Sequence, residues 1–305
     1  MRARRGNRKM LRVVMAWVGL LAAAGPLRAQ GVGEEVVRDT NVGYIDPAPL
    51  LNALRLRFDS SYDNNRPSRA EFFYPRAGQG FPGPRFADTF VDSQDVSAYA
   101  EAILLPRLSA FVEVPVRFFN GTLNDNATGL SDINAGVKVA LLADCNTAAT
   151  FQFRTYAPTG DSDRGLGTNH VTLEPAFLLY RRVTEGLAVE GELRAWVPVG
   201  GTSFAGNIVR YGVGASYRLP CTESLWVAPV AELVGWTGLD GKETAVAAPD
   251  VSAIQDAAGD TIVNAKVGLR TGLGDRGSFY VGYGRPLTGE VWYKNTVRVE
   301  LRLNY

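Results

Sequence analysis

Histidine, cysteine and methionine are scarce in this sequence, which contains 1, 2 and 3 of them among 305 residues. Any mechanism that depends on a histidine must therefore use His170. Beyond the first 25 residues, no apolar run approaches the roughly 20 residues that a membrane-spanning helix requires. The sequence therefore predicts no helical membrane anchor.

The first 29 residues have the pattern of an export signal. Six basic residues at positions 2–12 precede the apolar run VVMAWVGLLAAAG (13–25) and the sequence Leu27-Arg28-Ala29-Gln30. This pattern predicts a secretory signal peptide, 1–29, that is cleaved after Ala29. Seven of the 32 basic residues lie in it, which leaves 25 basic and 31 acidic residues in the mature chain. The resulting net charge of about −6 argues against nucleic acid as a partner.

The last ten residues, TVRVELRLNY (296–305), alternate strictly between apolar and polar side chains. Successive side chains of a strand point to opposite faces, so this segment has one apolar and one charged face. An aromatic final residue after such a strand resembles the closing strand of a bacterial outer-membrane β-barrel. The resemblance implies that Leu301, Leu303 and Tyr305 form the signal that the barrel-assembly machinery recognises.

The same alternation recurs along the chain and predicts an all-β fold, a single transmembrane antiparallel β-barrel of about twelve strands. An even number is expected of bacterial single-chain barrels. The predicted strands lie near 54–63, 95–105, 107–118, 131–143, 148–157, 169–181, 185–198, 205–219, 224–238, 261–272, 277–285 and 293–305.

The links between these strands alternate between short and long. Short links are expected at the periplasmic end and long ones outside the cell, and a soluble β-sandwich, the alternative, has no reason to keep this order. We therefore predict a periplasmic N-terminal segment at 30–53, a barrel at 54–305 in the outer membrane, and periplasmic termini. The short links lie at Pro106, 144–147, 181–186, 220–224 and 273–276, and the clearest long ones at 64–94, 119–130, 157–168 and 239–260.

If the apolar faces meet outer-membrane lipid, the charged faces meet inside the barrel, because an isolated charge in hydrocarbon costs several kcal/mol. Charges of both signs are interleaved there, so they either set the selectivity of a water-filled passage or prop a narrow barrel. Twelve strands enclose less room than porins of 16–18 strands, which favours a restricted path. The residues predicted to set the lumen field are Glu113, Arg117, Arg154, Glu192, Arg194 and Arg210.

The first long link contains the aromatic sequence AEFFYPRAGQGFPGPRF (70–86). An exposed loop this aromatic is unfavourable in water, so we expect it to fold onto another part of the protein. Two interpretations remain open: a constriction at the barrel mouth, or packing against other external loops. The constriction would be formed by Phe72, Phe73, Tyr74 and Arg76.

Two blocks carry a family resemblance. GLSDINAGVKVALL (129–142) and YAPTGDSDRGLGTNHVTLEPAFLLY (156–180) resemble motifs of the phenol-degradation (MetA-pathway) type outer-membrane transporters. The resemblance implies a β-barrel channel, and some members are linked to uptake of aromatic or hydrophobic compounds. We therefore expect passive passage of small solutes, hydrophobic or aromatic ones included, with no cofactor.

Two other functions stay open as alternatives: a non-conducting structural or adhesion barrel, and an outer-membrane lipid hydrolase. The hydrolase requires a His paired with a Ser nucleophile on the outer side of the barrel, and no Ser lies at matching spacing from His170. We therefore predict that the protein is not an enzyme and that His170 packs a loop.

Two further patterns are weaker. Asp161 and Asp163 begin a D-x-D-x-G fragment that lacks the remaining oxygen ligands of a calcium loop, so no metal site is predicted. Cys145 and Cys221 both lie in predicted periplasmic turns, in a compartment that permits a disulfide. Their turns are four strand positions apart, about 20 Å of arc, which makes pairing unfavourable.

Overall fold

The structure is a computed structural model, and it describes residues 37, 40–64, 83–86, 88, 90–222, 225–248, 251–273, 276–289 and 293–305. All of them belong to one unit of the chain, Val36–Tyr305. The predicted signal peptide (1–29) lies outside the described residues and stays a prediction. The same holds for the predicted loop-constriction residues Phe72, Phe73, Tyr74 and Arg76.

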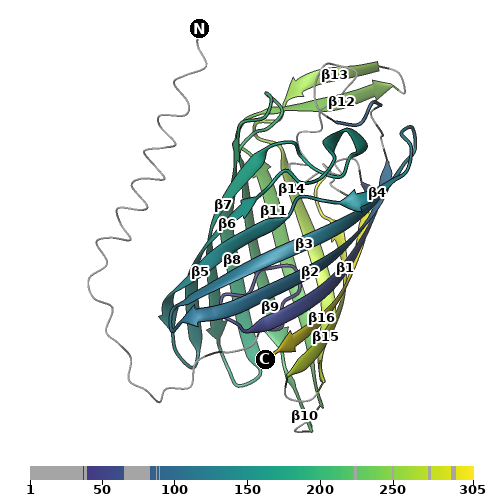
Figure 1. The fold of residues 1–305 in the computed structure, drawn as a ribbon. Coiled ribbons are helices and arrows are strands. Elements are labelled where there is room, and N and C mark those ends of the chain that lie inside the picture. Colours follow the sequence, from purple (N-terminus) through teal and green to yellow (C-terminus); the bar gives the residue numbers. More distant parts are fainter. Residues whose placement is uncertain are drawn as a thin grey trace. The chain divides into compact units, whose positions relative to one another are not determined.

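Twelve long antiparallel strands form the wall of the barrel (Figure 1). Each overlaps one of the twelve predicted strands in the same order, so the predicted all-β barrel is confirmed. The strands are β1 (Ala53–Asn64), β2 (Val91–Leu105), β3 (Leu108–Gly121), β5 (Asn134–Ala143), β6 (Thr147–Tyr156), β7 (Val171–Arg182), β8 (Leu187–Val199), β9 (Ile208–Tyr217), β11 (Leu225–Gly238), β14 (Thr261–Leu273), β15 (Gly277–Pro286) and β16 (Asn295–Asn304).

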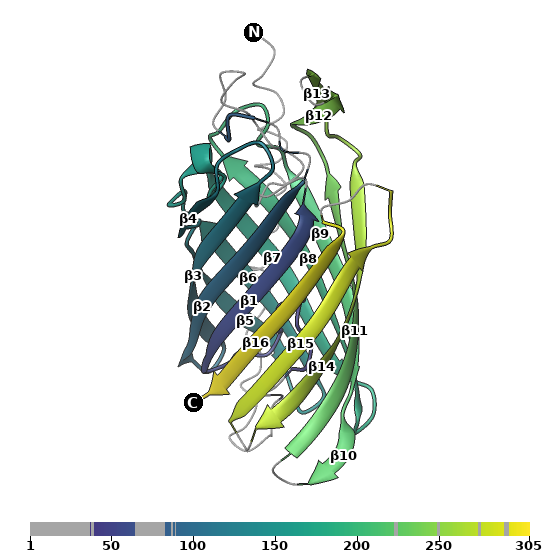
Figure 2. The ribbon, with the colours of Figure 1, turned by 90° about the vertical axis from the view of Figure 1, so that its right-hand side faces the viewer.

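The wall closes on itself between the first and last strands. β1 pairs with β16 from Ala53 opposite Asn304 to Tyr62 opposite Asn295, and Figure 2 shows the two strands side by side. β9 pairs with β11 in the same antiparallel way. Closure leaves none of the twelve strands with an unpaired edge, which matters in lipid, where no water satisfies free backbone groups. The start of β1 and the end of β16 lie at the same end of the barrel.

Four short strands depart from the sequence-based boundaries. β4 (Ala127–Leu130) pairs with β3, and the strand expected from residue 131 begins only at Asn134 as β5. β10 (Leu219–Thr222) is separate from β9. The long link after β11, which was expected to be a loop, contains the hairpin β12 (Lys242–Ala248) and β13 (Val251–Asp256), at the barrel end opposite the C-terminus (Figures 1 and 2).

Helix is nearly absent from the described part of the chain, where it is limited to the 3-10 turn η2 (Ser162–Arg164). Asp161 caps this turn by accepting a hydrogen bond from the backbone N–H of Asp163. No described helix is long and apolar enough to cross a bilayer.

Side chains of the strands separate by face as the alternation predicts. On β1, Leu54 and Leu56 are 49% and 55% exposed, whereas Arg55 between them is 6% exposed. On β16, Leu301 and Leu303 are exposed and Arg302 is buried. The apolar side chains therefore cover the outside of the barrel and the charged ones fill the inside.

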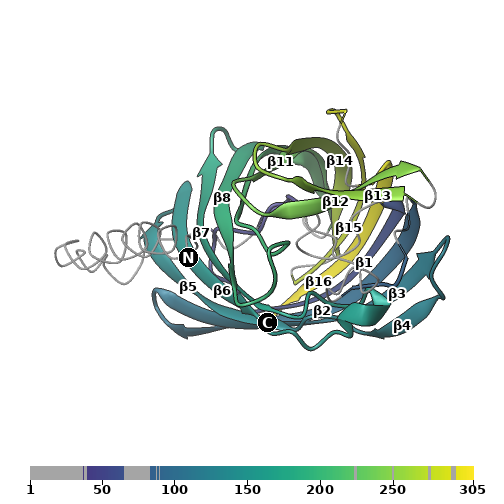
Figure 3. The same cartoon turned by 90° about the horizontal axis from the view of Figure 1, so that it is seen from above.

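The chain that precedes β1 lies inside the barrel. Residues 40–52, which we call the lumen segment, form the purple ribbon within the ring of strands in Figure 3. The sequence predicted an N-terminal segment at 30–53 but did not place any of it in the lumen. A cluster of buried apolar residues lies here too, where Val42, Tyr44 and Ile45 of this segment pack with Trp196 and Ile208 of the wall.

Candidate functional site

The lumen segment has no regular secondary structure, so its backbone polar groups need other partners. Basic and hydroxyl side chains of the wall supply donors for its carbonyl groups. The donors come from five strands, which places the segment across the lumen. The bonds run from Arg302 to Thr40 (2.9 Å), from Arg270 to Asn41 and Val42 (both 2.9 Å), from Arg298 to Gly43 (2.6 Å), from Arg210 to Tyr44 (2.7 Å), from Lys138 to Pro47 (3.2 Å) and from Thr150 to Ala48 (2.6 Å).

The N–H groups of the lumen segment are held by acidic residues. The carboxylate of Glu232 accepts hydrogen bonds from three successive backbone N–H groups, those of Gly43 (3.2 Å), Tyr44 (2.9 Å) and Ile45 (2.9 Å). Hydrogen bonds to an ionised acceptor are stronger than those between neutral groups. Glu232 therefore fixes the depth at which the segment sits in the barrel.

Asp46 is the charged residue of the lumen segment, and it meets two arginines of the wall. Its Oδ2 lies 2.7 Å from Arg154 Nη2 and 3.0 Å from Arg194 Nη1. Arg194 also contacts Glu174 (2.9 Å) and Glu192. Since these charges are shielded from water, each depends on its neighbours for compensation.

Two further ion clusters join strands of the wall around the segment. In the first cluster, the carboxylate of Glu300 forms ion pairs with the guanidinium groups of Arg270 (2.9 Å), Arg302 (3.2 Å) and Arg57 (3.3 Å). The second cluster pairs Glu101 with Lys138 (2.9 Å), and Glu101 also accepts hydrogen bonds from Tyr99 (2.6 Å), Ser109 (2.7 Å) and the backbone N–H of Leu51 (3.2 Å).

Gly43 is required where the segment passes the ring of Tyr280. A Cβ atom there would lie 2.3 Å from Cε1 of Tyr280, which is fully buried. Two wall glycines, Gly268 and Gly282, leave room for the same ring, since a Cβ at either would lie within 2.5 Å of its hydroxyl. The ring of Tyr280 therefore occupies the space of three missing side chains, and its hydroxyl donates to Glu232 (3.4 Å).

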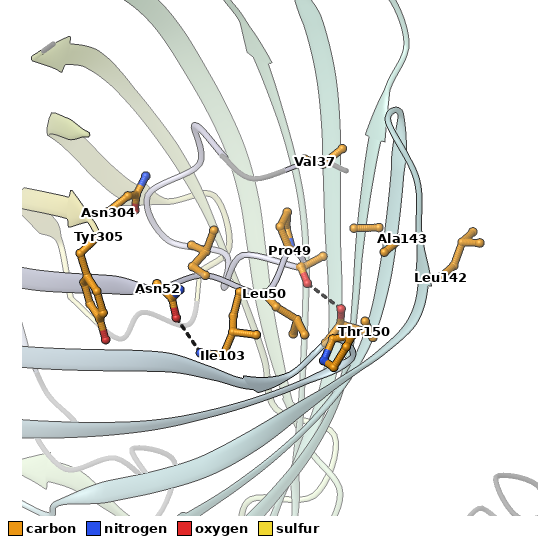
Figure 4. A pocket seen from close by; sticks show the side chains of 15 residues that line it. Val37, Pro49, Leu50, Asn52, Ile103, Leu142, Ala143, Thr150, Asn304 and Tyr305 are labelled. Carbon is orange, nitrogen blue, oxygen red and sulfur yellow. Dashed lines mark hydrogen bonds between the residues drawn. The ribbon is translucent and has the colours of Figure 1, made fainter. Parts of the chain in front are cut away.

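Cavities lie on both sides of the lumen segment. One, of about 450 Å³, is at the end of the short links, and Figure 4 shows Pro49 and Leu50 there beside Thr150 of β6. A second, of about 200 Å³, is at the end of the long links and is lined by Tyr44. A third, of about 190 Å³, lies next to the second and shares Asp59 and Arg117 with it. The segment thus lies between the cavity at one end and the two at the other.

The structure brings together four of the six residues predicted to set the lumen field. Arg154, Glu192, Arg194 and Arg210 surround the lumen segment at Tyr44 and Asp46. The other two lie closer to the long links: Glu113 is 3.5 Å from Arg57, and Arg117 forms a two-point contact with Asp95 at 2.7 and 3.0 Å. Arg154, Glu192 and Arg194 are buried, whereas the other three side chains are partly exposed. The role of all six in selectivity stays a prediction.

Sequence reasoning missed Asp46 and Glu232, the two carboxylates that hold the lumen segment most directly. A signal for Asp46 was present: it is the single charge in the otherwise apolar run NVGYIDPAPLL (41–51). Such a run before a barrel indicates burial. Glu232 is buried next to the exposed Leu233 on β11. It shows the same alternation of charged and apolar side chains as the residues that were predicted to set the lumen field.

The residues considered for a hydrolase, for a disulfide and for the assembly signal lie in separate parts of the structure. His170 is buried, and its Nδ1 lies 2.8 Å from the carbonyl oxygen of Thr168, a local contact at the start of β7. Cys145 is free and exposed in a short link, while the side chain of Cys221 lies outside the described part. Leu301, Leu303 and Tyr305 are exposed on the outer face, where their role in assembly stays a prediction.

A closed twelve-stranded antiparallel barrel with an apolar outside and a charged lumen is the fold of an outer-membrane β-barrel. The chain belongs to the family described as "Putative MetA-pathway of phenol degradation", whose model matches residues 82–297. The resemblance seen in the sequence is thus confirmed. No curated protein sequence matches the chain significantly.

The solved structures that match the chain include an outer-membrane channel and two porins. The COG4313 outer membrane channel from Pseudomonas putida F1 has a TM-score of 0.53 at 13% identity, covering 88% of this chain and 100% of that one. The NanC porin has a TM-score of 0.48 at 10% identity, with 83% and 100% coverage. The KdgM porin has a TM-score of 0.45 at 9% identity, with 83% and 99% coverage. At these identities the likeness concerns the fold alone.

Proposed function

We propose that this protein is an outer-membrane channel through which small solutes diffuse, and that the lumen segment restricts its passage. The observation that carries the proposal is the location of the lumen segment. It lies inside the barrel between two cavities, and the surrounding wall is lined by paired charges. The segment is held by hydrogen bonds and ion pairs, and it contains no cysteine, so its covalent attachment to the wall is the chain that continues into β1. It is therefore able to move aside without unfolding the wall.

The orientation follows the rule that short links face the periplasm. The signal peptide delivers the chain, the barrel-assembly machinery reads the strand that ends at Tyr305, and outer-membrane lipid surrounds the apolar face. The lumen segment then enters from the periplasmic end, where both termini of the barrel lie. A solute from outside meets the two smaller cavities first.

Planar-bilayer recording tests the channel. The mature wild-type protein is expected to give stepwise conductance, and a variant that lacks residues 40–50 is expected to give larger steps. Arg154→Glu is expected to shift the ion selectivity towards cations, because it reverses a charge beside Asp46. Equal conductance with and without residues 40–50 would show that the segment does not restrict passage.

A non-conducting structural barrel is the second candidate, and the same observation favours it. A lumen filled by its own chain and propped by ion pairs needs no solute. Folded wild-type protein that is silent in the bilayer, together with a silent variant lacking residues 40–50, would establish this alternative.

A further inference from the structure

The cavity of about 200 Å³ at the end of the long links has an aromatic wall. Pockets for drug-sized ligands begin at roughly 300 Å³, so this one limits a ligand to a single small ring or its equivalent. Rings of this kind bind the apolar body of a ligand by stacking and edge contacts. The aromatic residues of the wall are Tyr44, Trp196, Trp236 and Tyr293.

The charges that line this cavity do not balance. Four basic residues meet two acidic ones, and a third carboxylate lies just behind them. Three of the four basic side chains are matched by these carboxylates. Arg298 contacts Asp59 at 2.6 and 2.8 Å, Arg117 contacts Asp95 at 2.7 and 3.0 Å, and Arg210 contacts Glu192 at 2.9 Å.

Lys266 is the fourth, and it has no counterion. It is 4% exposed, and among the residues that the structure describes no carboxylate lies within 4.0 Å of its ammonium group. The ammonium contacts the Tyr293 hydroxyl and lies 3.7 Å from the centre of the Tyr44 ring. Glu232 is its cross-strand neighbour, but that carboxylate accepts the N–H groups of the lumen segment instead.

A buried ammonium without a counterion is costly, which makes this position favourable for an incoming anion. The ammonium donates one hydrogen bond to the Tyr293 hydroxyl, which leaves its other N–H groups for a ligand. Its charge beside aromatic rings matches the carboxylate and the apolar body of an organic acid.

We propose that this cavity binds a small monocarboxylate with an apolar body. The carboxylate accepts hydrogen bonds from the ammonium of Lys266, and the body lies among Trp196, Trp236 and Tyr293. The inference rests on the proposed channel function, for which it names the class of solute. The ligand also contacts Tyr44 of the lumen segment, so an occupied site touches the element that restricts the passage.

The neighbouring cavity provides an internal contrast. Its volume is similar, about 190 Å³, but its charges have the opposite balance. Two arginines there face four carboxylates, which repels an anion. The acidic residues are Asp59, Asp95, Glu113 and Asp132, and the basic ones are Arg57 and Arg117.

Isothermal titration of the folded mature protein in detergent tests the site, with benzoate as the probe and benzamide as its neutral isostere. Benzoate is expected to bind saturably and benzamide is not. Lys266→Gln is expected to weaken benzoate binding about tenfold or more, the usual effect of losing a charged hydrogen bond. Lys294→Gln, at an exposed lysine paired with Asp63, is the matched control and is expected to leave binding unchanged.

Equal binding of benzoate and benzamide, unchanged binding by Lys266→Gln, or no binding by the wild type would overturn the site. If Lys266→Gln fails to fold, Lys266→Arg replaces it and is expected to retain benzoate binding. The titration needs no conduction, so the two proposals fail separately. Conductance without benzoate binding refutes the site alone, and benzoate binding by a protein that is silent in bilayers refutes the channel alone.

Discussion

Oδ2 of Asp46 lies 3.0 Å from Nη1 of Arg194, although 148 residues separate the two in sequence. The arginine side chain is fully buried, and the aspartate belongs to a segment with no regular structure. Together with Arg154, this contact ties the chain before the first strand to the opposite wall of the barrel. The lumen thus contains residues 40–52, which belong to none of the twelve strands of the wall.

Asp46→Ala is expected to release the lumen segment. The substitution leaves Arg154 and Arg194 with one carboxylate fewer, and loss of one partner from a buried ion pair costs roughly 3–5 kcal/mol. In bilayer recordings the variant is expected to show larger or more frequent conductance steps than the wild type. Asp125→Ala, at an exposed loop position, is the control, and identical recordings from both variants would contradict the prediction.

Glu232→Gln is expected to loosen residues 43–45 without opening the wall. The neutral amide keeps one acceptor oxygen but loses the charge that strengthens three N–H hydrogen bonds, at a cost of about 1.5–3 kcal/mol. Hydrogen exchange of peptides that cover residues 43–45 is expected to be roughly tenfold faster or more. Glu185→Gln, in an exposed turn, serves as the control. Unchanged exchange in the Glu232 variant would show that the carboxylate does not hold the segment.

Gly43→Ala is expected to destabilise the protein by about 1–3 kcal/mol, the usual cost of overpacking. The added methyl group would lie 2.3 Å from Cε1 of Tyr280, whose side chain is fully buried. Guanidinium unfolding in detergent measures the loss. The matched control is Gly289→Ala, where a Cβ has no atom within 4 Å, and equal midpoints for the two variants would argue against close packing at Gly43.

Val267→Arg is expected to impair insertion of the barrel into lipid. Val267 lies on the outer face of β14 and is 58% exposed, and an arginine on the lipid face near the bilayer centre costs roughly 2–4 kcal/mol. Val183→Arg changes an equally exposed valine that follows the end of β7, where a charge meets water. The yield of folded protein in vesicles is expected to fall for Val267→Arg only. A similar yield for both would mean that the outer face of β14 is not in contact with lipid.

The strands were predictable because their signal is local. In β16, Glu300 and Arg302 alternate with Leu301 and Leu303, and this period of two specifies both the strand and the side that each residue faces. The boundaries at Asn134 and Tyr217 were less accurate, because the ends of strands depend on loop contacts that no periodicity records. The hairpin of β12 and β13 was missed for the same reason.

The charged lumen residues were also predictable as a set, but their partners were not. Alternation placed Arg154, Glu192 and Arg194 inside the barrel, and the structure assigns all three to one cluster around Asp46. Which acid meets which base depends on the register of neighbouring strands. That register is a property of the closed sheet rather than of any single strand.

The kind of wall that this protein builds can thus be derived from the order of its residues, because the alternation of side chains acts between near neighbours. What lies inside the wall depends on contacts that form in the folded barrel. Residues 40–52 have no periodicity to reveal their location, because their backbone is held by side chains from strands far along the chain, such as Glu232 and Arg270. Those donors and acceptors converge only after the ring of strands has closed, so the site exists in the assembled barrel and in no segment of it.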